Sequence, residues 1–389
     1  MEKLVTSNLK LGIIAGGQLG KMLIQEASKW DIISYVLDKD ENCPSCFITS
    51  HYVKGDQLDY DTVYRFGKEL DVVTYEIENI NIEALHKLKS EGVRVLPDPA
   101  ILGMVQDKGL QKEFYSSHDI PTSSFQIYKG QEAIMQDIAE GTLKYPFVQK
   151  LRKGGYDGRG VSVIYDEKDD SKLMEGPSVV EELVDIDKEI SVIVARNERG
   201  EIKCFPAVEM VFDKTANLVD RLVCPSGIGE KASEEAGKIA EKLIKDLNMT
   251  GLLAVEFFMD KEGKILVNEM APRPHNSGHH TIESVITSQY EQHLRAILNL
   301  PLGSTHLKMP AVMVNLLGEK GYKGPVKYEG LTECMAIEGV KIHVYGKKIT
   351  WPMRKMGHVT VMAKNLEKAI ENAQKVKDTI KVKSWKGNQ

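Results

Sequence analysis

Short apolar runs alternate with amphipathic stretches through the first hundred residues, and this alternation constrains the fold more than any other feature of the chain. The expected strands are the apolar runs at 10–15, 32–37, 72–75 and 93–96. The expected helices lie between them, at 19–28, 61–70 and 82–91. Because parallel strands need a crossover connection, the alternation predicts a parallel sheet with helices on both faces.

Past residue 100, where P-D-P-A interrupts the alternation, the pattern changes. A helix is expected at 107–117, then strands and glycine-rich turns, then a helix at 233–247 and a hairpin of apolar strands at 252–260 and 264–270. The last part of the chain has strand-like segments at 311–318, 333–340, 341–345 and 358–363, before a helix at 365–380. The chain therefore predicts a mixed α/β and α+β fold.

Composition and charge exclude several classes of protein. Apolar residues make up 42% of the 389 residues, which is enough for a buried core, so most of the chain is not expected to be disordered. The net charge of −5 lacks the basic excess of a dedicated nucleic-acid binder. No apolar run approaches the roughly 20 residues that span a bilayer, so no membrane segment is expected. The start M-E-K-L-V-T-S-N lacks a signal-peptide core, so we expect a cytoplasmic protein.

The spacing C-P-S-C places Cys43 and Cys46 in one polar loop. Such a pair suggests a metal or redox site, but no second C-x-x-C and no nearby pair of histidines completes a zinc site. The five cysteines of the chain are too few for a disulfide scaffold. We therefore expect both thiols to be reduced.

A glycine-rich turn, A-G-G-Q-L-G, joins the first expected strand to the first expected helix. It matches the dinucleotide fingerprint G-x-G-x-x-G except that Ala15 replaces the first glycine. Asp38 ends the next strand, at about the sequence distance of a ribose ligand. A Rossmann dehydrogenase is therefore one interpretation; a phosphate bound at the helix N-terminus and a plain tight turn are the other two.

The segment Y-E-I-E-N follows an expected parallel strand, at the end where open α/β sheets bind ligands. Glu76 and Glu78 are two residues apart, so their side chains are expected on one face. Two carboxylates facing a core are costly, so that face is expected to meet either a ligand or solvent.

Four glycines fall within the eight residues K-G-G-Y-D-G-R-G at 153–160. Such a loop lets the backbone fold closely over phosphates, and Lys150, Lys153 and Arg159 add positive charge. It is not a Walker A motif, because G-x-x-x-x-G-K-[ST] is absent. A polar hairpin turn is the structural alternative.

Two acidic residues interrupt the apolar hairpin strands V-E-F-F and V-N-E-M. Glu256 and Glu269 are expected on adjacent strands, where neighbours on one face lie about 5 Å apart at Cβ. Carboxylates that close repel each other unless a cation intervenes. Magnesium prefers oxygen ligands and shares them with nucleotide phosphates, so this pair, with Asn268 beside it, predicts a magnesium site.

A polar cluster follows the hairpin directly, A-P-R-P-H-N-S-G-H-H at 271–280. Its prolines and glycine predict a loop, so the histidines lack the helical spacing of a zinc site. Arg273, His275 and Asn276 together suit an anionic substrate better.

A basic segment lies near the end of the chain, K-K-I-T-W-P-M-R-K-M-G-H at 347–358. It carries Lys347, Arg354, Lys355 and His358 within an expected β-rich region. From spacing alone, a substrate-binding hairpin and an ordinary basic surface hairpin are equally good interpretations.

Taken together, five strings resemble the 5-(carboxyamino)imidazole ribonucleotide synthases of the ATP-grasp superfamily. They occur in the family's order: G-G-Q-L-G-K-M, Y-E-I-E-N, G-G-Y-D-G-R-G, N-E-M-A-P-R-P-H-N-S-G-H and R-K-M-G-H. The resemblance covers roughly residues 9 to 362. Lys21 stands where the family often has arginine, and Phe212 where some members have histidine.

The resemblance implies an ATP-grasp fold in three parts. Residues 1–105 would form a Rossmann-like N-terminal domain, residues 106–300 the ATP-grasp domain with a lid at about 120–185, and residues 301–389 a small β-rich C-terminal module. It implies that ATP, bicarbonate and 5-aminoimidazole ribonucleotide give ADP, phosphate and the N-carboxylated ribonucleotide through carboxyphosphate, in purine synthesis. A homodimer is also implied.

The resemblance further assigns residues to ligands. Those implied to bind ATP are Lys108, Lys150, Gly155, Tyr156, Asp157, Gly158, Arg159, Gly160, Val161, Glu181, Glu182, Leu183, Val184, Glu189, Phe212, Asn268 and Glu269. Those implied to hold bicarbonate for catalysis are Arg273, His275 and Asn276, and those implied to bind magnesium are Glu256 and Glu269. Those implied to bind the ribonucleotide are Glu76, Glu78, Tyr156, Asp157, Arg159, Lys347 and Arg354.

Three other classes of protein fit parts of the chain. Within the superfamily, biotin carboxylase and formate-dependent glycinamide ribonucleotide transformylase also form acyl phosphates, but their sequences differ at G-G-Y-D-G-R-G and H-N-S-G-H. A nucleotide-sensing protein without catalysis need not keep Glu256, Glu269 and Lys150. A Rossmann dehydrogenase would need the intact glycine fingerprint.

Overall fold

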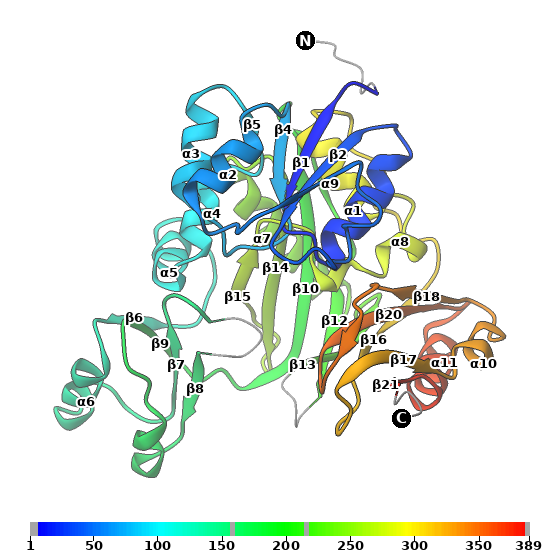
Figure 1. Ribbon diagram of the computed structural model, residues 1–389. Helices are drawn as coiled ribbons and strands as arrows, with labels where there is room; N and C mark the ends of the chain where they lie inside the picture. Colours follow the sequence, from blue (N-terminus) through cyan, green and yellow to red (C-terminus); the bar gives the residue numbers. More distant parts are fainter. Residues whose placement is uncertain (1–6, 156–159, 214–217, 386–389) are drawn as a thin grey trace.

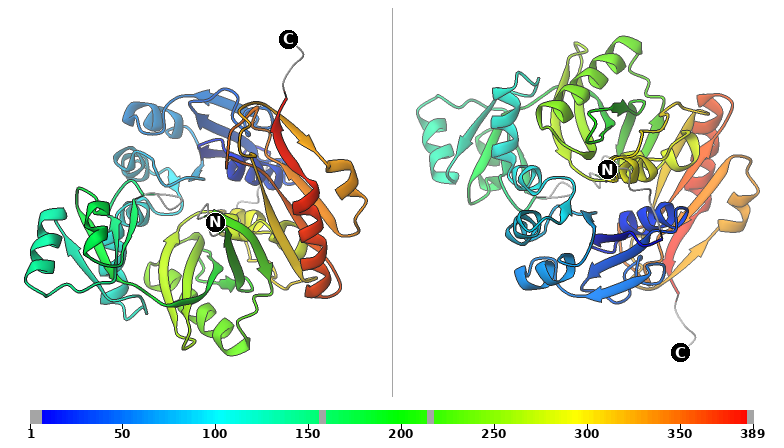
Figure 2. Two further views of the ribbon diagram at one scale, coloured as in Figure 1. Left: turned by 90° about the horizontal axis from the view of Figure 1, so that it is seen from below. Right: turned by 90° about the horizontal axis from the view of Figure 1, so that it is seen from above.

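The protein is described from a computed structural model, in which residues 7–155, 160–213 and 218–385 are placed (Figure 1). An N-terminal domain and a large central sheet form the body of the molecule. Viewed from above and below, a small outer sheet and a C-terminal module lie at opposite ends of this body (Figure 2). Within the described residues, no helix is both long enough and apolar enough to cross a bilayer.

The N-terminal domain contains an open parallel sheet, as the sequence predicts. Its strand order is β3-β2-β1-β4-β5, and every pairing is parallel. The strands are β1 (Lys10–Ile14), β2 (Ile33–Asp38), β3 (His51–Lys54), β4 (Val72–Tyr75) and β5 (Arg94–Val95). The sequence pattern does not predict β3, because this edge strand is mostly exposed and lacks an apolar run.

Helices cover both faces of this parallel sheet. They are α1 (Gln18–Ser28), α2 (Tyr60–Gly67), α3 (Ile82–Ser90) and α9 (Gln289–Ile297). On one face α2 and α3 bury Phe66 and Leu88 against the strands. On the other face α1 packs beside α9 through Leu23 and Leu294, so a helix from much later in the chain fixes the N-terminal domain to the body.

The central sheet is antiparallel, with the strand order β15-β14-β10-β12-β13-β16-β20-β18, and β11 pairs with β10. Its strands are β10 (Ile186–Arg196), β11 (Ile202–Cys204), β12 (Val208–Asp213), β13 (Leu218–Cys224), β14 (Gly251–Asp260), β15 (Ile265–Ala271), β16 (Ala311–Leu317), β18 (Val340–Val344) and β20 (Lys355–Met362). Helix α7 (Glu230–Asp246) buries Leu243 and Ile244 in the main core. The β14–β15 hairpin is the one that the sequence predicts.

The outer sheet, with the strand order β6-β9-β7-β8, projects away from the body (Figure 1). Its elements are β6 (Phe125–Tyr128), α6 (Gln131–Ala139), β7 (Phe147–Leu151), β8 (Val161–Ile164), η1 (Glu167–Lys172) and β9 (Ser178–Glu182). The helices α4 (Pro99–Val105) and α5 (Lys108–Ser117) lead into it. A separate small core around Ile134, Phe147 and Ile164 holds this sheet together.

The C-terminal module joins the end of the central sheet. It adds α10 (Leu331–Met335), α11 (Leu366–Thr379) and a small sheet of β17 (Gly324–Glu329), β19 (Ile349–Thr350) and β21 (Lys381–Ser384). The expected strand at 333–340 is wrong, because its first residues belong to α10. Leu331, Cys334 and Ile337 pack on the module's core, and this spacing of three is helical rather than alternating.

Candidate active site

An ion pair fixes the start of α5 and thereby places Lys108. The carboxylate of Asp107 accepts the backbone N–H of Gly109 at 2.9 Å and binds Nε of Arg152 at 2.7 Å. Lys108 is the first residue of the helix, and its Nζ lies 2.7 Å from Oε2 of Glu269 on β15. Burial opposes a charge on Lys108, but Glu269 outweighs this effect and raises the pKa of the lysine.

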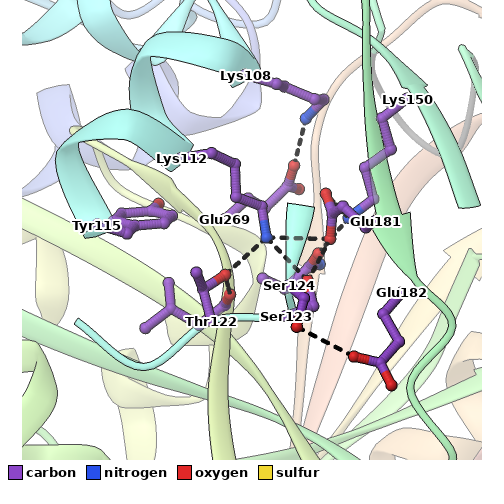
Figure 3. A network of polar contacts seen from close by, with 12 residues as sticks. Lys108, Lys112, Tyr115, Thr122, Ser123, Ser124, Lys150, Glu181, Glu182 and Glu269 are labelled. Atoms are coloured by element: carbon purple, nitrogen blue, oxygen red, sulfur yellow. Dashed lines mark hydrogen bonds and ion pairs between the residues drawn. The ribbon is translucent and has the colours of Figure 1, made fainter. Parts of the chain in front are cut away.

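Two further lysines share the carboxylate of Glu181, at the end of β9 (Figure 3). Nζ of Lys150 on β7 lies 3.0 Å from Oε1, and Nζ of Lys112 on α5 lies 3.0 Å from Oε2. Lys150 also donates to Oδ1 of Asn268 at 2.8 Å. Burial opposes ionisation of Glu181, but the charges of Lys150 and Lys112 outweigh it and lower the pKa of Glu181 to about 2. The structure therefore gathers three ammonium groups, with Lys108, at the base of the outer sheet.

Two carboxylates face each other across the β14–β15 hairpin. Glu256 and Glu269 are direct partners in the pairing register, as their spacing predicts. Burial, together with the charge of Glu269, raises the pKa of Glu256. Lys108 lowers the pKa of Glu269 against the effect of burial. The pair thus presents oxygen ligands beside the lysines, with the ammonium of Lys108 on only one of the two carboxylates.

The connection from β9 to β10 borders the same group of lysines. Glu182 is exposed, and Leu183 and Val184 are half-buried in the connection. Glu189 follows on β10, where burial raises its pKa to about 7. Phe212 is on β12, two strands from β14 in the sheet, and packs beside the small apolar cluster that underlies β12 and β13.

The glycine-rich loop lies only partly within the described residues. Tyr156, Asp157, Gly158 and Arg159 are outside them. Gly155 and Gly160 flank this gap, and Gly160 has φ +73°, a backbone conformation that favours glycine. A Cβ at Gly160 would lie 3.2 Å from Cα of Gly155, so the two ends of the loop approach each other closely. Val161 follows as the exposed first residue of β8.

Arg273 connects the loop after β15 to the N-terminal domain. Its Nη2 lies 2.8 Å from Oε1 of Glu78. Its Nε is buried and has no hydrogen-bond partner among the residues that the structure describes. Because buried guanidinium groups normally bond all their N–H groups, a spare one fits a small anion.

His275 approaches the carboxylate pair from the same loop. Its Nε2 lies 3.3 Å from Oε1 of Glu256, and its Nδ1 accepts the backbone N–H of Ser277 at 3.3 Å. Burial and the neighbouring Arg273 lower the pKa of His275 to about 3, so the ring is neutral. Its single proton is therefore assigned to Nε2, facing Glu256. Asn276 is next in the chain and begins the short helix η2 (Asn276–Gly278).

The expectation of a side chain that faces ligand or solvent is wrong for Glu76. Strand β4 ends before Glu76 and Glu78, so strand alternation does not apply. Glu76 is only 4% exposed; its carboxylate accepts the backbone N–H of Gly17 and, at 2.6 Å, that of Gly20. These bonds satisfy the buried charge, although burial still raises the pKa of Glu76. Glu78 instead pairs with Arg273.

The glycine turn is held by hydrogen bonds to two carboxylates. Asp38, which the dehydrogenase interpretation places on a ribose, accepts the backbone N–H of Gly16 at 2.7 Å. Glu76 accepts two more N–H groups of this turn, those of Gly17 and Gly20. Ala15 has φ +71°, so the turn keeps the conformation of the fingerprint's first glycine without that glycine.

The basic segment packs against the N-terminal domain. Nζ of Lys21 on α1 donates to two backbone carbonyls just before this segment, at 3.0 and 3.1 Å. Within it, Lys347 donates to the carbonyl of Lys355 at 2.9 Å, and the guanidinium of Arg354 stacks 3.7 Å from the ring centre of Trp351. The segment is therefore part of the junction between the C-terminal module and α1.

The expected pair of reduced thiols is also wrong. Cys43 and Cys46 form a disulfide, because the intervening Pro44–Ser45 turn brings their Cα atoms to 5.4 Å. This loop packs on the glycine turn, since the backbone N–H of Ser45 donates to the carbonyl of Gly16 at 2.9 Å.

Three side chains that complete the lysine network are not predicted from the sequence. Lys112 contacts Glu181, and Thr122 and Ser123 accept hydrogen bonds from Lys112. The signal for Lys112 was its spacing of four from Lys108, which puts both lysines on one face of a helix. The residues in T-S-S gave no such signal, because their role depends on contacts from other elements.

Family models match most of the chain in three consecutive parts. The ribonucleotide synthetase preATP-grasp domain matches residues 9–106, the ATP-grasp domain residues 113–290, and the phosphoribosylaminoimidazole carboxylase C-terminal domain residues 311–372. The fold is accordingly mixed α/β with an ATP-grasp domain, as the sequence resemblance implies.

Curated relatives are similar over nearly the whole chain. The N5-carboxyaminoimidazole ribonucleotide synthase of Bacillus subtilis is 37% identical over 371 residues, which cover 93% of each protein. The chloroplastic phosphoribosylaminoimidazole carboxylase of Vigna aconitifolia is also 37% identical over 93% of this chain, but the match spans only 65% of that protein. This chain therefore spans about two thirds of the length of the Vigna protein.

Solved structures give the same result. The N5-carboxyaminoimidazole ribonucleotide synthetase of Thermotoga maritima is 45% identical, with a TM-score of 0.89 over 97% of this chain and 100% of that one. The N5-carboxyaminoimidazole synthase of Aspergillus clavatus, solved with ADP and 5-aminoimidazole ribonucleotide, is 30% identical, with a TM-score of 0.87 over 96% and 99% of the two chains.

Proposed function

The chain belongs to the N5-carboxyaminoimidazole ribonucleotide synthase family, and from this premise we propose that it carboxylates 5-aminoimidazole ribonucleotide with bicarbonate, using ATP. It is an ATP-grasp ligase, and its products would be ADP, phosphate and N5-carboxyaminoimidazole ribonucleotide. The observation that carries the proposal is the meeting of three kinds of group at one site: a group of lysines, a carboxylate pair, and an arginine whose buried Nε–H is unpartnered among the described residues.

The lysines supply the positive charge that phosphoryl transfer needs. Lys108 and Lys150 would bind phosphate oxygens of ATP, and the loop at Gly155–Gly160 would fold over them. The β9–β10 connection from Glu181 to Val184 would hold the adenine, and Glu189 the ribose. Transfer of the γ-phosphoryl group depends on positioning and charge neutralisation rather than on a covalent intermediate with the protein.

The carboxylate pair supports a magnesium ion beside the phosphates. Glu256 and Glu269 offer hard oxygen donors from adjacent strands, which is the kind of ligand that magnesium prefers, and Asn268 lies next to them. Two carboxylates so close, one of them largely buried, are costly without a cation. When bound, magnesium would neutralise charge on the phosphate oxygens.

The loop after β15 supports bicarbonate as the acceptor of the phosphoryl group. The unpartnered Nε of Arg273 would donate to the anion, and the neutral ring of His275 and the amide of Asn276 would orient it. Bicarbonate is a poor electrophile because of its charge and resonance. Phosphorylation gives carboxyphosphate, which releases carbon dioxide when its C–O bond to the phosphate oxygen breaks.

The ribonucleotide would enter from the side of the basic segment. Lys347 and Arg354 would bind its phosphate, and Glu78, already paired with Arg273, would lie between the two substrates. Tyr156, Asp157 and Arg159 belong to the same proposal from sequence resemblance, although they lie outside the described residues. The exocyclic amine of the imidazole then captures carbon dioxide, and exclusion of water protects the intermediate.

Phosphate release tests this function directly. With ATP and magnesium present, release is expected to require both 5-aminoimidazole ribonucleotide and bicarbonate for its full rate. Equal release with neither substrate present would identify an uncoupled ATPase and overturn the proposal. Release driven by formate or by biotin in place of these substrates would instead favour another ATP-grasp ligase.

A homodimer in the cytoplasm is the assembly and location that we propose. The resemblance to the family supports the dimer, and sedimentation equilibrium would then give twice the chain mass of 43.5 kDa. A mass equal to one chain would contradict it. Fractionation of the producing cells, followed by an immunoblot, tests the location.

A further inference from the structure

Lys112 is a buried lysine whose hydrogen-bonding capacity is fully used inside the protein. It is 2% exposed, and its Nζ contacts Oγ1 of Thr122 at 2.6 Å, Oγ of Ser123 at 3.0 Å and Oε2 of Glu181 at 3.0 Å (Figure 3). An ammonium group has three N–H donors, and three acceptors meet it here. Lys112 therefore has no donor left for a nucleotide.

The charge of Lys112 compensates the buried carboxylate of Glu181. Glu181 is 3% exposed, and its two oxygens are divided between cations: Oε1 lies 3.0 Å from Nζ of Lys150, and Oε2 lies 3.0 Å from Nζ of Lys112. Ser123 adds a hydrogen bond to Oε2 at 2.6 Å. A carboxylate buried to this degree is stable only while a cation and hydrogen bonds compensate its charge.

Lys150 and Lys112 differ in what else they can bind. Lys150 contacts two elements: it pairs with Glu181 on β9 and donates to Asn268 on β15. It is also one of the two lysines proposed to bind ATP phosphates. A phosphate oxygen bound to Lys150 competes with Glu181 for the same positive charge. Lys112 faces no such competition, because its remaining donors are bound to Thr122 and Ser123.

We propose that Lys112 is a positioning residue that acts as the permanent counter-ion of Glu181, so that the charge of Lys150 becomes available to the nucleotide phosphates. This inference rests on the proposed role of Lys150 in ATP binding. Without Lys112, nucleotide binding would draw Lys150 away from a buried carboxylate that pairs with no other cation in the part of the chain that the structure describes. With Lys112 present, Glu181 stays compensated in both states.

The electrostatics of the pair are consistent with a permanent role. Burial opposes ionisation of Glu181, but Lys150 and Lys112 outweigh it, and its pKa of about 2 keeps it charged at neutral pH. Thr122, which accepts from Lys112, also donates to the carbonyl of Val267 on β15 at 2.7 Å. The counter-ion is thus anchored to the body of the protein, while Glu181 belongs to the outer sheet.

The test is a cycle of variants measured by titration with a non-hydrolysable ATP analogue. Lys112→Met removes the charge and keeps most of the side-chain volume, and is expected to weaken binding by about 100-fold, as when a buried charge loses its partner. Combining Lys112→Met with Glu181→Gln also removes the buried anion whose charge Lys112 compensates. The double variant is therefore expected to recover at least about 10-fold of the affinity that Lys112→Met loses.

Two readouts separate positioning from a general structural role. The KM for 5-aminoimidazole ribonucleotide is expected to change less than about twofold in Lys112→Met, because only nucleotide binding uses the positive charge of Lys150. Lys383→Met is the matched control: it breaks a Lys–Glu ion pair of 2.7 Å in the C-terminal module and should leave both substrates unaffected.

Three results would overturn the inference. Lys112→Met could bind the analogue like wild type, the double variant could remain as weak as the single one, or both substrates could lose affinity equally. Failure of the wild-type protein to bind the analogue would instead remove the proposed ATP site itself. If Lys112→Met does not fold, a crystal structure of the wild-type protein with the analogue decides: Lys112 should stay on Glu181 while Lys150 contacts a phosphate oxygen, and departure of Lys112 would contradict the proposal.

Discussion

Glu256 on β14 and Glu269 on β15 are direct cross-strand partners, and Lys108 binds only the second of them, at 2.7 Å. Among the described residues, Glu256 therefore lies beside Glu269 without an ion pair to a lysine. This asymmetry, at the base of the outer sheet, is the structural reason to expect a divalent cation here.

Removing either carboxylate should therefore abolish turnover. Glu256→Gln and Glu269→Gln are each expected to lower kcat by at least about 100-fold, because each loses an anionic ligand of the proposed magnesium ion. Glu262→Gln, in the exposed turn of the same hairpin, is the matched control and should behave like wild type. Near-normal turnover of both site variants at ordinary magnesium concentrations would refute the metal assignment.

The glycine-rich loop should be sensitive to a side chain where its two ends meet. Gly160→Ala places a Cβ 3.2 Å from Cα of Gly155, whereas Gly154→Ala, at a similar positive φ, meets nothing within 4 Å. Both variants share a left-handed backbone cost of about 1 kcal/mol. We expect the KM for ATP to rise about fivefold more in Gly160→Ala than in Gly154→Ala. Identical kinetics in the two variants would show that the close approach has no role in catalysis.

Arg354 should matter to the ribonucleotide and not to ATP. Arg354→Gln is expected to lower kcat/KM for the ribonucleotide by about 5- to 150-fold, the range for losing one partner of a charge-assisted bond. Affinity for a non-hydrolysable ATP analogue should hardly change. Arg199→Gln is the control, because Arg199 is exposed and donates to a backbone carbonyl elsewhere. An equal loss for both substrates would assign the basic segment to the fold or to the nucleotide site.

Nucleotide affinity should depend on pH through Glu189, whose pKa burial raises to about 7. In the nucleotide-free protein this raised pKa favours folding at low pH, and that contribution is lost as pH rises through 7. A ribose hydroxyl that donates a hydrogen bond to this carboxylate favours its ionised form. ADP affinity should therefore fall as pH drops below 7. Titration without magnesium isolates this effect. Glu189→Gln should flatten the profile, and an unchanged slope in that variant would exclude Glu189.

Much of the site could be predicted because it depends on local pattern. The pairing of Glu256 with Glu269 follows from two short apolar strands and a tight turn, and strand register then fixes which side chains meet. The parallel N-terminal sheet follows in the same way from its alternating elements. Lys150 is predicted from its place beside the glycine-rich loop as well as from the resemblance, and Lys108 from the resemblance alone. The structure adds the anions that hold both lysines.

The features that could not be predicted depend on contacts between distant segments. Glu76 is stable in the core only because two backbone N–H groups, 56 and 59 residues earlier, bond its carboxylate. Lys112 looks like an ordinary polar residue of a helix until β9 brings Glu181 to it. The disulfide at Cys43 depends on the geometry of a loop that has no sequence rule of its own.

The most direct test of the central claim uses bicarbonate labelled with both ¹³C and ¹⁸O. If carboxyphosphate forms, one bicarbonate oxygen stays with phosphorus when the C–O bond breaks. NMR should then find ¹³C in the carboxylated ribonucleotide and one ¹⁸O in each inorganic phosphate released. Carboxylated product accompanied by phosphate without ¹⁸O, or ATP consumption without ¹³C in the ribonucleotide, would contradict the proposed reaction.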